Sequence, residues 1–338
     1  MSRWIHPSIM LLFLLATAPT FAGAAPGPPG ETTLSKENVW FSVIRDGHLT
    51  LARDAITMVV ADNQAYGPEH RAGYNGVSDL RHRERDANLF VPTYAGLNLE
   101  FIHDGSDRIL DRDVLFEPRR HPMELRKIND HTAELYQSPT PNWKVESATR
   151  FALRPDGVIE MTFHCRATEP VFKYGYAGFF WASYIDRPTS KAIHFRGHSL
   201  NQDEPRWITA FTPKHGVLAM HPAVSDTRIF KRDERIPDQF LIFARSRYRY
   251  TEPFYYGVSH GMALVYMFRP EDQIRMTQSP TGGGPTNPAW DFQWFVPDIE
   301  VGQLYGFQMR AAYLPRTSEQ DIAALARRHI AELTEPAR

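Results

Sequence analysis

The loop Pro68–Gly76 combines several groups that could take part in acid/base chemistry. It holds an imidazole, a guanidinium, a phenol and an amide within nine residues, from His70, Arg71, Tyr74 and Asn75. Histidine and tyrosine can transfer protons, and arginine can neutralise a developing anion or hold a carboxylate. The alternative is an ordinary exposed turn. We interpret His70 and Tyr74 as candidate catalytic residues, and Arg71 and Asn75 as candidate substrate-binding residues.

A second candidate segment is Tyr255–Gly261, in which His260 stands next to a glycine. A histidine between a strand and a turn can project into a cleft, so we take His260 as a candidate catalytic residue. Tyr255 and Tyr256 are candidate sugar-stacking residues, because aromatic rings match the apolar face of a sugar. The alternative is a structural histidine at a sheet edge. The functional interpretation requires His260 to lie near His70 or Asp291.

The segment Gln278–Trp294 is a loop rich in glycine and proline that leads into an alternating strand. Successive side chains of a strand point to opposite faces, so the even-numbered aromatic side chains from Trp290 to Trp294 share one face. Asp291 and Gln293 share the other. One interpretation gives Trp290 and Gln293 to substrate binding and Asp291 to catalysis. In the other, the aromatic residues are core, and Asp291 with the glycine-rich loop faces solvent or ligand.

Other reactive groups carry weaker signals. His194 and His198 are four apart, but the surrounding pattern is that of a strand, where such residues lie about 13 Å apart, too far for one zinc ion. Glu160 and His164 likewise match no metal motif, and the only cysteine, Cys165, alternates with apolar residues as a core thiol does. No Gly-x-Ser-x-Gly elbow and no glycine-rich nucleotide motif occurs. The sequence therefore predicts neither a metal nor a cofactor.

The chain ends and the charge balance restrict location and partners. Residues 1–25 have the features of a secretory signal, and residues 26–35 form a leader rich in proline and glycine. The sequence predicts a periplasmic or secreted protein without a membrane anchor. The 38 basic and 39 acidic residues nearly cancel and form no basic block, so nucleic acid is not an expected partner. The oligomeric state stays open.

The elements that must position these residues are mostly strands. Alternating and β-branched runs recur, and Asp-Gly pairs at 46–47, 104–105 and 156–157 predict hairpins. We expect an all-β fold, one large antiparallel β-sandwich over residues 36–315. Residues 316–338 should form a C-terminal helix, because Thr317 and Gln320 resemble a capping box ahead of helical spacing.

The strand-rich pattern over residues 35–315, with its scattered polar residues, resembles the galactose-mutarotase-like β-sandwich superfamily. That superfamily includes sugar mutarotases and domains of polysaccharide lyases and glycosidases. Mutarotase-like enzymes carry an Asn/Arg pair early in the chain, a histidine in the middle strands and a carboxylate late in the chain. The resemblance implies that Arg71 and Asn75 correspond to the early pair and Asp291 to the late carboxylate. The middle histidine would be His164, His194 or His198. True mutarotases carry a late Glu, so the aspartate argues against simple anomer interconversion.

Together these features predict an exported carbohydrate-active enzyme, a lyase or a glycoside hydrolase, acting on a polysaccharide or oligosaccharide. The alternative from another class is a non-catalytic glycan-binding or envelope structural protein. A cupin-like metal enzyme is a third possibility, and it would need three histidines converging near a carboxylate. A cleft that unites His70, Arg71, His260 and Asp291 would favour the enzyme.

Overall fold

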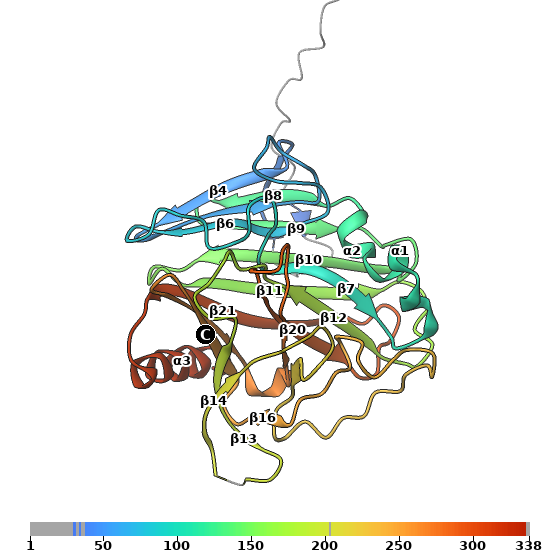
Figure 1. Cartoon of the computed structure of the whole chain (residues 1–338). Coiled ribbons are helices and arrows are strands. Elements are labelled where there is room, and N and C mark those ends of the chain that lie inside the picture. The colour runs from blue at the N-terminus through green and yellow to red at the C-terminus, as the bar shows by residue number, and fades with distance from the viewer. Residues whose placement is uncertain (1–29, 32–33, 35–37, 203, 336–338) are drawn as a thin grey trace, which may run out of the picture.

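The structure is a computed structural model that describes residues 30–31, 34, 38–202 and 204–335. The predicted signal peptide and most of the predicted leader lie outside the described residues. Strands dominate the described part, and every pair of neighbouring strands within a sheet is antiparallel. The predicted class, an all-β antiparallel sandwich with a C-terminal helix, is confirmed (Figure 1).

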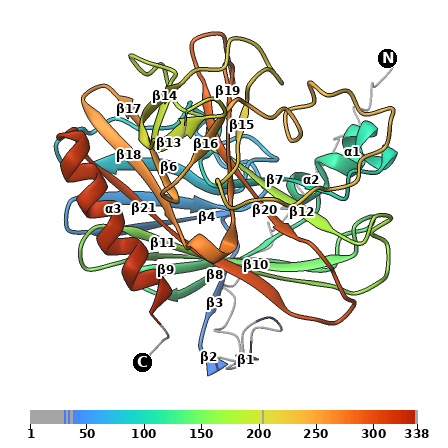
Figure 2. The ribbon, with the colours of Figure 1, turned by 90° about the horizontal axis from the view of Figure 1, so that it is seen from below.

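The largest sheet has eleven described strands. In spatial order they are β14 (Arg206–Ala210), β13 (Ile193–Ser199), β17 (Phe254–Ser259), β18 (Met262–Phe268), β21 (Tyr305–Pro315), β11 (Ile159–Ala167), β10 (Val145–Leu153), β9 (Thr132–Gln137), β8 (Glu124–Asn129) and β3 (Ser42–Ile44), with β16 (Tyr248–Tyr250) paired to β13. Figure 2 shows helix α3 (Glu319–Thr334) lying along this sheet, next to β18 and β21.

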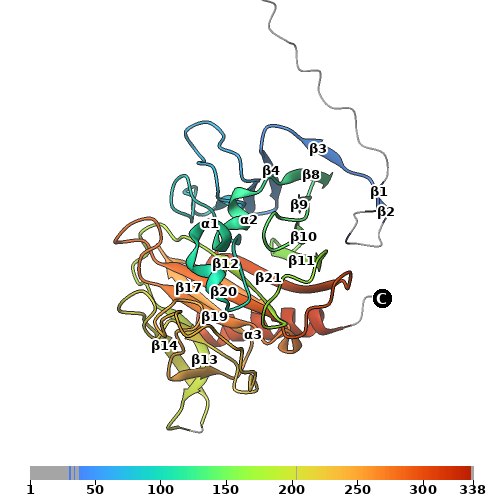
Figure 3. The same cartoon turned by 90° about the vertical axis from the view of Figure 1, so that its right-hand side faces the viewer.

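Smaller sheets and short helices complete the fold. A five-stranded sheet runs β15 (Met220–His221), β19 (Arg275–Ser279), β20 (Ala289–Val296), β12 (Ala177–Ala182) and β7 (Asn98–His103), and a three-stranded sheet runs β4 (His48–Arg53), β5 (Ile56–Ala61) and β6 (Gly76–His82). β1 (Gly30–Glu31) pairs with β2 (Asn38–Val39). The helices are η1 (Asp107–Leu110), α1 (Arg112–Leu115), α2 (Glu117–Arg120), η2 (Pro270–Asp272) and α3 (Glu319–Thr334). Helices α1 and α2 contact β7, and they lie on the side of the molecule that faces the viewer in Figure 3.

Only one of the three Asp-Gly pairs closes the hairpin that the sequence predicts. Asp156-Gly157 joins β10 to β11, which pair along their full length. Asp46-Gly47 instead connects β3 to β4, which belong to different sheets, and Asp104-Gly105 leads from β7 into η1. All three glycines have φ between 71° and 74°, so each is a turn. The dipeptide specifies local backbone geometry, whereas pairing depends on distant strands.

The secondary-structure prediction also differs from the structure in particular segments. Residues 239–244 have the apolar composition of a strand but form a series of turns, from which Phe240 and Phe243 pack onto the core. The short helices between 107 and 120 were not expected, because only the C-terminus showed helical spacing. These helices matter because they carry three arginines that line the candidate site, Arg112, Arg119 and Arg120.

Strand β20 is buried on both faces. All its residues from Ala289 to Val296 are buried, and Trp290 and Phe292 are fully inaccessible. Phe292 stacks on Trp181 of β12 with ring centroids 5.3 Å apart. The interpretation that the aromatic residues are core is therefore correct. The expectation that Asp291 faces solvent is wrong, because Asp291 is buried and its carboxylate accepts a hydrogen bond from the backbone amide of Ser183.

Helix α3 packs on the face of the large sheet formed by β17, β18 and β21. Ile322, Ala323 and Ala326 of the helix contact a cluster of buried residues that includes Val265 and Met267. The helix begins one residue later than the predicted capping box. Ser318 is the N-cap, and its hydroxyl accepts a hydrogen bond from the Asp321 amide at 3.1 Å. None of the helices in the described chain is long and apolar enough to cross a membrane.

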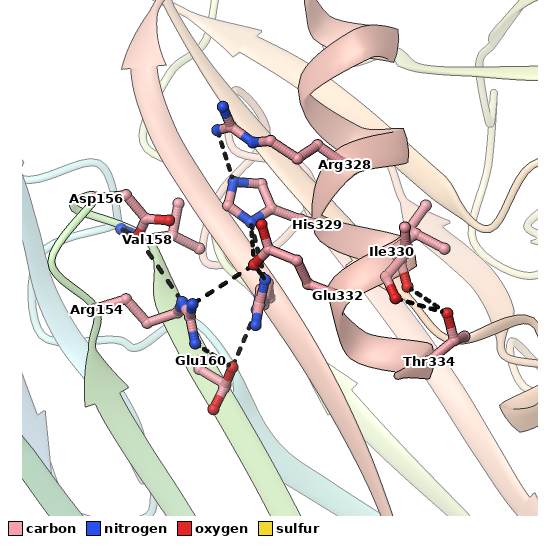
Figure 4. Close-up of polar contacts among 11 residues, drawn as sticks. Arg154, Asp156, Val158, Glu160, Arg328, His329, Ile330, Glu332 and Thr334 are labelled. Atoms are coloured by element: carbon pink, nitrogen blue, oxygen red, sulfur yellow. Dashed lines mark hydrogen bonds and ion pairs between the residues drawn. The ribbon is translucent and has the colours of Figure 1, made fainter. Parts of the chain in front are cut away.

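A charged network fastens the end of α3 to the sheet (Figure 4). The Arg310 guanidinium on β21 donates to Glu160 of β11 at 3.0 Å and also contacts Glu332 of α3. Its side chain is only 5 % exposed. Arg154 approaches the same two carboxylates, at 3.1 and 3.5 Å. The network therefore joins two strands and the helix through buried charge.

We expect Arg310→Gln to lower the free energy of unfolding by about 2–3 kcal/mol. This is less than the roughly 3–5 kcal/mol for breaking a fully buried ion pair, because Glu160 and Glu332 keep Arg154 as partner. The matched control is Arg327→Gln, which removes the 61 % exposed arginine that pairs with Glu252 and should cost at most about 1 kcal/mol. Urea unfolding of both variants measures the difference. Equal losses would show that the Arg310 network does not anchor the helix.

Two histidines are buried in the neutral form. Burial lowers the pKa of both His103 and His221 to about 3. The Gln278 amide donates to Nε2 of His221, so the ring proton lies on Nδ1, which faces the Ser246 hydroxyl at 2.6 Å. A second proton, on Nε2, would place the Nε2–H donor of His221 against the amide donor of Gln278. His103 packs against the rings of Tyr176, Phe243 and Phe295.

These histidines predict a loss of stability in acid. The unfolded chain binds a proton at each histidine near pH 6.5, whereas the folded chain does so only near pH 3, so stability falls as the pH drops below about 6.5. At pH 5 the loss is about 2 kcal/mol for each histidine. Urea unfolding at pH 7.5 and at pH 5 measures how much the free energy of unfolding falls between the two. In His221→Gln this fall should be smaller than in the wild type by about 2 kcal/mol. The half-buried His198→Gln is the control, and an unchanged pH dependence in His221→Gln would contradict the argument.

Candidate functional site

Two arginines, three tyrosines and a glutamate converge next to the glycine-rich loop. Their side chains come from the loop before β6, the loop between β6 and β7, strand β7 itself, helix α2 and the residue two positions after β12. We call this group the arginine–tyrosine cluster, and it consists of Arg71, Tyr74, Tyr94, Glu100, Arg119 and Tyr184. Segments up to 113 residues apart in the sequence thus meet at one place.

Glu100 owes its position to an irregularity in strand β7. Phe180 of β12 pairs with Phe101 and Trp181 pairs with Leu99, so Glu100 is the extra residue of a β-bulge. A bulge redirects its side chain out of the regular alternation. The carboxylate accepts a hydrogen bond from Arg119 at 2.9 Å and one from the Tyr184 hydroxyl at 2.5 Å. The local break in pairing thus directs a carboxylate toward the arginine and the tyrosines.

Glu100 holds a proton more tightly than an exposed glutamate does. Burial raises its pKa, and the charge of Arg119 and the hydrogen bond from Tyr184 offset only part of that rise. Its side chain is 9 % exposed. Burial likewise raises the pKa of Tyr184 well above its usual value. A partly buried carboxyl with a perturbed pKa beside a cation is a common arrangement in groups that transfer protons.

The arginines and tyrosines of the cluster stack on one another. The guanidinium carbon of Arg119 lies 3.9 Å from the ring centroid of Tyr74, and that of Arg71 lies 3.9 Å from the centroid of Tyr94. Arg71 also contacts the Tyr74 hydroxyl, and Arg119 donates to the carbonyl of Gly73. These contacts hold the planar cations against aromatic faces, which restricts their orientation before any ligand binds.

A cavity of about 280 Å³ opens beside the cluster. The rings of Tyr74 and Phe116 form part of its wall, and the charged side chains that line it are all cationic. The lining residues are Ala72, Gly73, Tyr74, Arg112, Phe116, Arg119 and Arg120. The side chain of Glu100 reaches this wall through its bond to Arg119. The cavity wall therefore combines aromatic side chains with cations, and the carboxyl of Glu100 lies behind Arg119.

The glycine-rich loop predicted to border a site does lie against this cluster. A Cβ atom at Gly283 would come within 2.8 Å of the Tyr94 ring, and one at Gly282 within 2.8 Å of the Tyr184 ring. Gly283 also has φ of +84°, which favours glycine. The loop can approach the two tyrosines this closely only because Gly282 and Gly283 have no side chains.

Asp291 lies beneath the same region. Its carboxylate accepts a hydrogen bond from the backbone amide of Ser183 at 3.1 Å, next to Tyr184. Burial raises the pKa of Asp291 well above its usual value, and the nearby charge of Glu100 adds to the rise. Asp291 is 1 % exposed, so it adjoins the cluster from the protein interior and does not reach the cavity.

The residues of the Pro68–Gly76 loop take different places. Arg71 and Tyr74 belong to the cluster, whereas Asn75 is buried and bonds to the backbone of Leu99 in both directions, at 2.9 and 3.1 Å. His70 is 2 % exposed and stacks on Tyr66, and burial lowers its pKa to about 4. The loop therefore contributes a cation and a phenol to the site, while its imidazole and amide face the interior.

The other predicted site residues lie in the core or elsewhere on the surface. Trp290, Gln293 and Tyr255 are buried, and the Tyr255 hydroxyl donates to the backbone carbonyl of Asp291 at 2.9 Å. Tyr256 points to the opposite face of the large sheet, among the residues that α3 covers. His260 is exposed at the turn between β17 and β18, with φ of 50°. The structure does not bring His260 together with His70 or Asp291 through any contact between described residues.

The side chains considered as metal ligands make other contacts in the structure. His194 stacks on Tyr256 with ring centroids 4.8 Å apart, and Glu160 belongs to the α3 network. Cys165 is buried, and burial raises the pKa of its thiol. Over residues 38–202 and 204–335, no three metal-ligating side chains converge. The cupin-like interpretation therefore finds no ligand set in the described chain.

Four residues of the cluster were not predicted from the sequence. Tyr94 and Tyr184 lie in segments with no distinctive local pattern, and Glu100 depends on a bulge that the pattern does not show. Arg119 had a usable signal, since Glu117 and Pro118 are typical of a helix start, where proline is favoured and acidic residues complement the dipole. Reading that signal would have placed Arg119 on a short helix.

No protein-family model and no curated protein sequence matches this chain. Among solved structures it is similar to a galactose mutarotase-like protein from Lactobacillus casei, at 10 % identity and TM-score 0.43 over 79 % of this chain and 100 % of that one. A galactose mutarotase related enzyme from Lactobacillus acidophilus gives 10 % identity and TM-score 0.47 over 80 % and 99 %. A heparan sulfate lyase from Pedobacter heparinus gives 11 % and 0.38 over 81 % and 36 %. The chain is similar in fold to galactose mutarotase-like proteins, and at these identities the similarity concerns the fold alone.

Proposed function

We propose that this protein is an exported carbohydrate-active enzyme, a lyase or a glycoside hydrolase, that works by acid/base chemistry at the arginine–tyrosine cluster. The observation that carries the proposal is the bulged Glu100, whose raised pKa and contacts with Arg119 and Tyr184 suit proton transfer beside an aromatic cavity. The half-buried ring of Phe116 in the cavity wall suits the C–H face of a sugar. Export rests on the features of residues 1–25.

Each group has a role in this proposal. Glu100 exchanges a proton with the substrate, and the Tyr184 hydroxyl holds its carboxyl in place. Arg119 neutralises negative charge that develops during the reaction, and Tyr74 and Arg71 border the sugar. Asp291 helps to position Tyr184, because its carboxylate accepts a hydrogen bond from the backbone amide of the preceding residue, Ser183. This proposal assigns no proton transfer to His70 or His260, because the His70 ring is buried with a lowered pKa and His260 stands at the exposed turn between β17 and β18.

The test is incubation of the purified mature protein with a panel of acidic and neutral polysaccharides. New reducing ends and the absorbance of unsaturated products are followed together. Reducing ends without absorbance indicate hydrolysis, and both signals together indicate elimination. Binding to a glycan without either signal would contradict the enzyme and support the glycan-binding alternative. That alternative draws on one observation, the low exposure of the Glu100 side chain.

A further inference from the structure

We propose that the cavity beside α2 binds an oxyanion carried by the sugar, a carboxylate or a sulfate ester, so that the ligand is an acidic glycan. This inference rests on the proposed function and names its substrate class. It starts from the four arginines around the cavity. Three of them line the cavity, Arg112, Arg119 and Arg120, and the fourth, Arg71, contacts the hydroxyl of the lining residue Tyr74.

The protein neutralises only part of this charge. Arg119 pairs with Glu100, and Arg120 contacts Asp113. Among the described residues, Arg71 and Arg112 have no carboxylate within ion-pair distance. Since burial raises the pKa of Glu100, that carboxyl compensates less charge than an exposed glutamate would. The arginines around the cavity, the exposed Arg71, Arg112 and Arg120 and the half-buried Arg119, therefore carry an excess of positive charge. An anionic ligand could form charge-assisted hydrogen bonds with them.

The arrangement of the cations fits a planar or tetrahedral oxyanion on a sugar ring. A guanidinium donates two parallel hydrogen bonds to a carboxylate or a sulfate, which an ammonium group does not match. The guanidinium carbons of Arg112 and Arg119 lie 5.3 and 5.1 Å from the ring centroid of Phe116. A sugar packed on that aromatic wall would present its substituents to both cations. The cavity of about 280 Å³ is near the lower limit for small-molecule sites and suits a single sugar unit.

A second cavity on the protein shows that this charge pattern is particular to its place. The cavity of about 690 Å³ beside β3 is lined by three carboxylates, from Asp46, Asp62 and Glu124, and by one arginine, Arg45. It is larger and its lining has the opposite charge balance. Local electrostatics, and not the nearly neutral net charge of the chain, therefore selects the cavity beside α2 for an anionic ligand.

The experiment measures binding of three tetrasaccharides to the mature protein by calorimetry: a galacturonate, a sulfated galactose and a glucose oligomer. At least one acidic oligomer should bind, and at least ten-fold more tightly than the glucose oligomer. Arg112→Gln should weaken that binding about ten-fold, as expected for loss of a charge-assisted hydrogen bond. The exposed side chain of Arg112 makes no hydrogen bond or ion pair with the described residues and only borders the Phe116 ring, so this variant should fold normally. Raising the salt from 0.05 to 0.5 M should weaken the binding further.

Arg206→Gln is the matched control, because it removes an exposed arginine on the edge strand β14, away from the cavity, and should leave binding unchanged. Preference for the galacturonate or for the sulfated oligomer identifies the oxyanion. Equal or tighter binding of the glucose oligomer would overturn the inference while leaving the proposed function intact. Failure of all three oligomers and of the polysaccharide panel would overturn both. An equal loss of affinity in Arg112→Gln and Arg206→Gln would overturn the assignment of the oxyanion to this cavity.

Discussion

Replacing Glu100 with glutamine should lower turnover on the glycan substrate by about 100-fold to 10,000-fold, the range for loss of a positioned acid or base. The amide keeps the size of the side chain and can still accept a hydrogen bond from Arg119. It cannot exchange a proton at the operating pH. The affinity for substrate should change little, because the cavity wall is formed by the rings and arginines and Glu100 lies behind Arg119.

The readout is the rate of product formation at saturating substrate, measured together with the unfolding transition in urea. Glu84→Gln is the control, since Glu84 is exposed in the turn after β6 and the change of charge is the same. Full turnover in Glu100→Gln would remove Glu100 as the proton-transfer group. A variant that lost turnover and stability together would instead indicate that the ion pair with Arg119 is structural.

Trp290→Ala should lower the free energy of unfolding by about 3–5 kcal/mol, the range for truncating a large buried aromatic side chain. Trp290 has no exposed surface, and its indole N–H donates to the Lys191 carbonyl at 3.2 Å. Its ring packs so closely on Gly257 of β17 that a Cβ atom there would lie 2.3 Å from it. The substitution would leave a cavity between the two sheets and an unpaired carbonyl.

Trp40→Ala is the matched control, because Trp40 is 63 % exposed and its loss should change stability by no more than about 0.5 kcal/mol. Urea unfolding of the two variants and glycan binding by the folded protein are the measurements. If Trp290→Ala weakened glycan binding without affecting stability, the indole would be a sugar platform, as the first interpretation of its strand proposed. A loss of stability alone identifies it as core.

Local patterns gave part of the candidate site. The Pro68–Gly76 loop was selected for its mixture of functional groups, and two of its residues, Arg71 and Tyr74, lie in the cluster. The glycine-rich loop was selected for its composition, and it does pack against Tyr94 and Tyr184. His260 stands apart from the cluster for a physical reason. His260-Gly261, with φ of 50° and 81°, forms the two-residue turn of a hairpin, so its position reflects backbone geometry.

The sequence by itself determined the features that depend on neighbouring residues. The alternation in Val158–His164 predicts a strand with one buried face, and β11 alternates between buried and half-buried residues along its length. The aromatic period of Ala289–Val296 placed its rings on one shared face of the strand, and the helical spacing after residue 318 produced α3. These outcomes follow from side-chain direction and capping, which act over a few residues.

Only the tertiary structure decided which of these segments meet. The sequence could not show that Asp291 is covered on its own face, because burial of a polar face depends on a second layer packed over it. Nor could it show that β7 bulges at Glu100, since a bulge results from register with the neighbouring strand β12. Arg71, Glu100, Arg119 and Tyr184 are distant in the chain and meet through the pairing of β12 with β7 and the docking of α2. Long-range register, which no local pattern encodes, therefore assembles the candidate site.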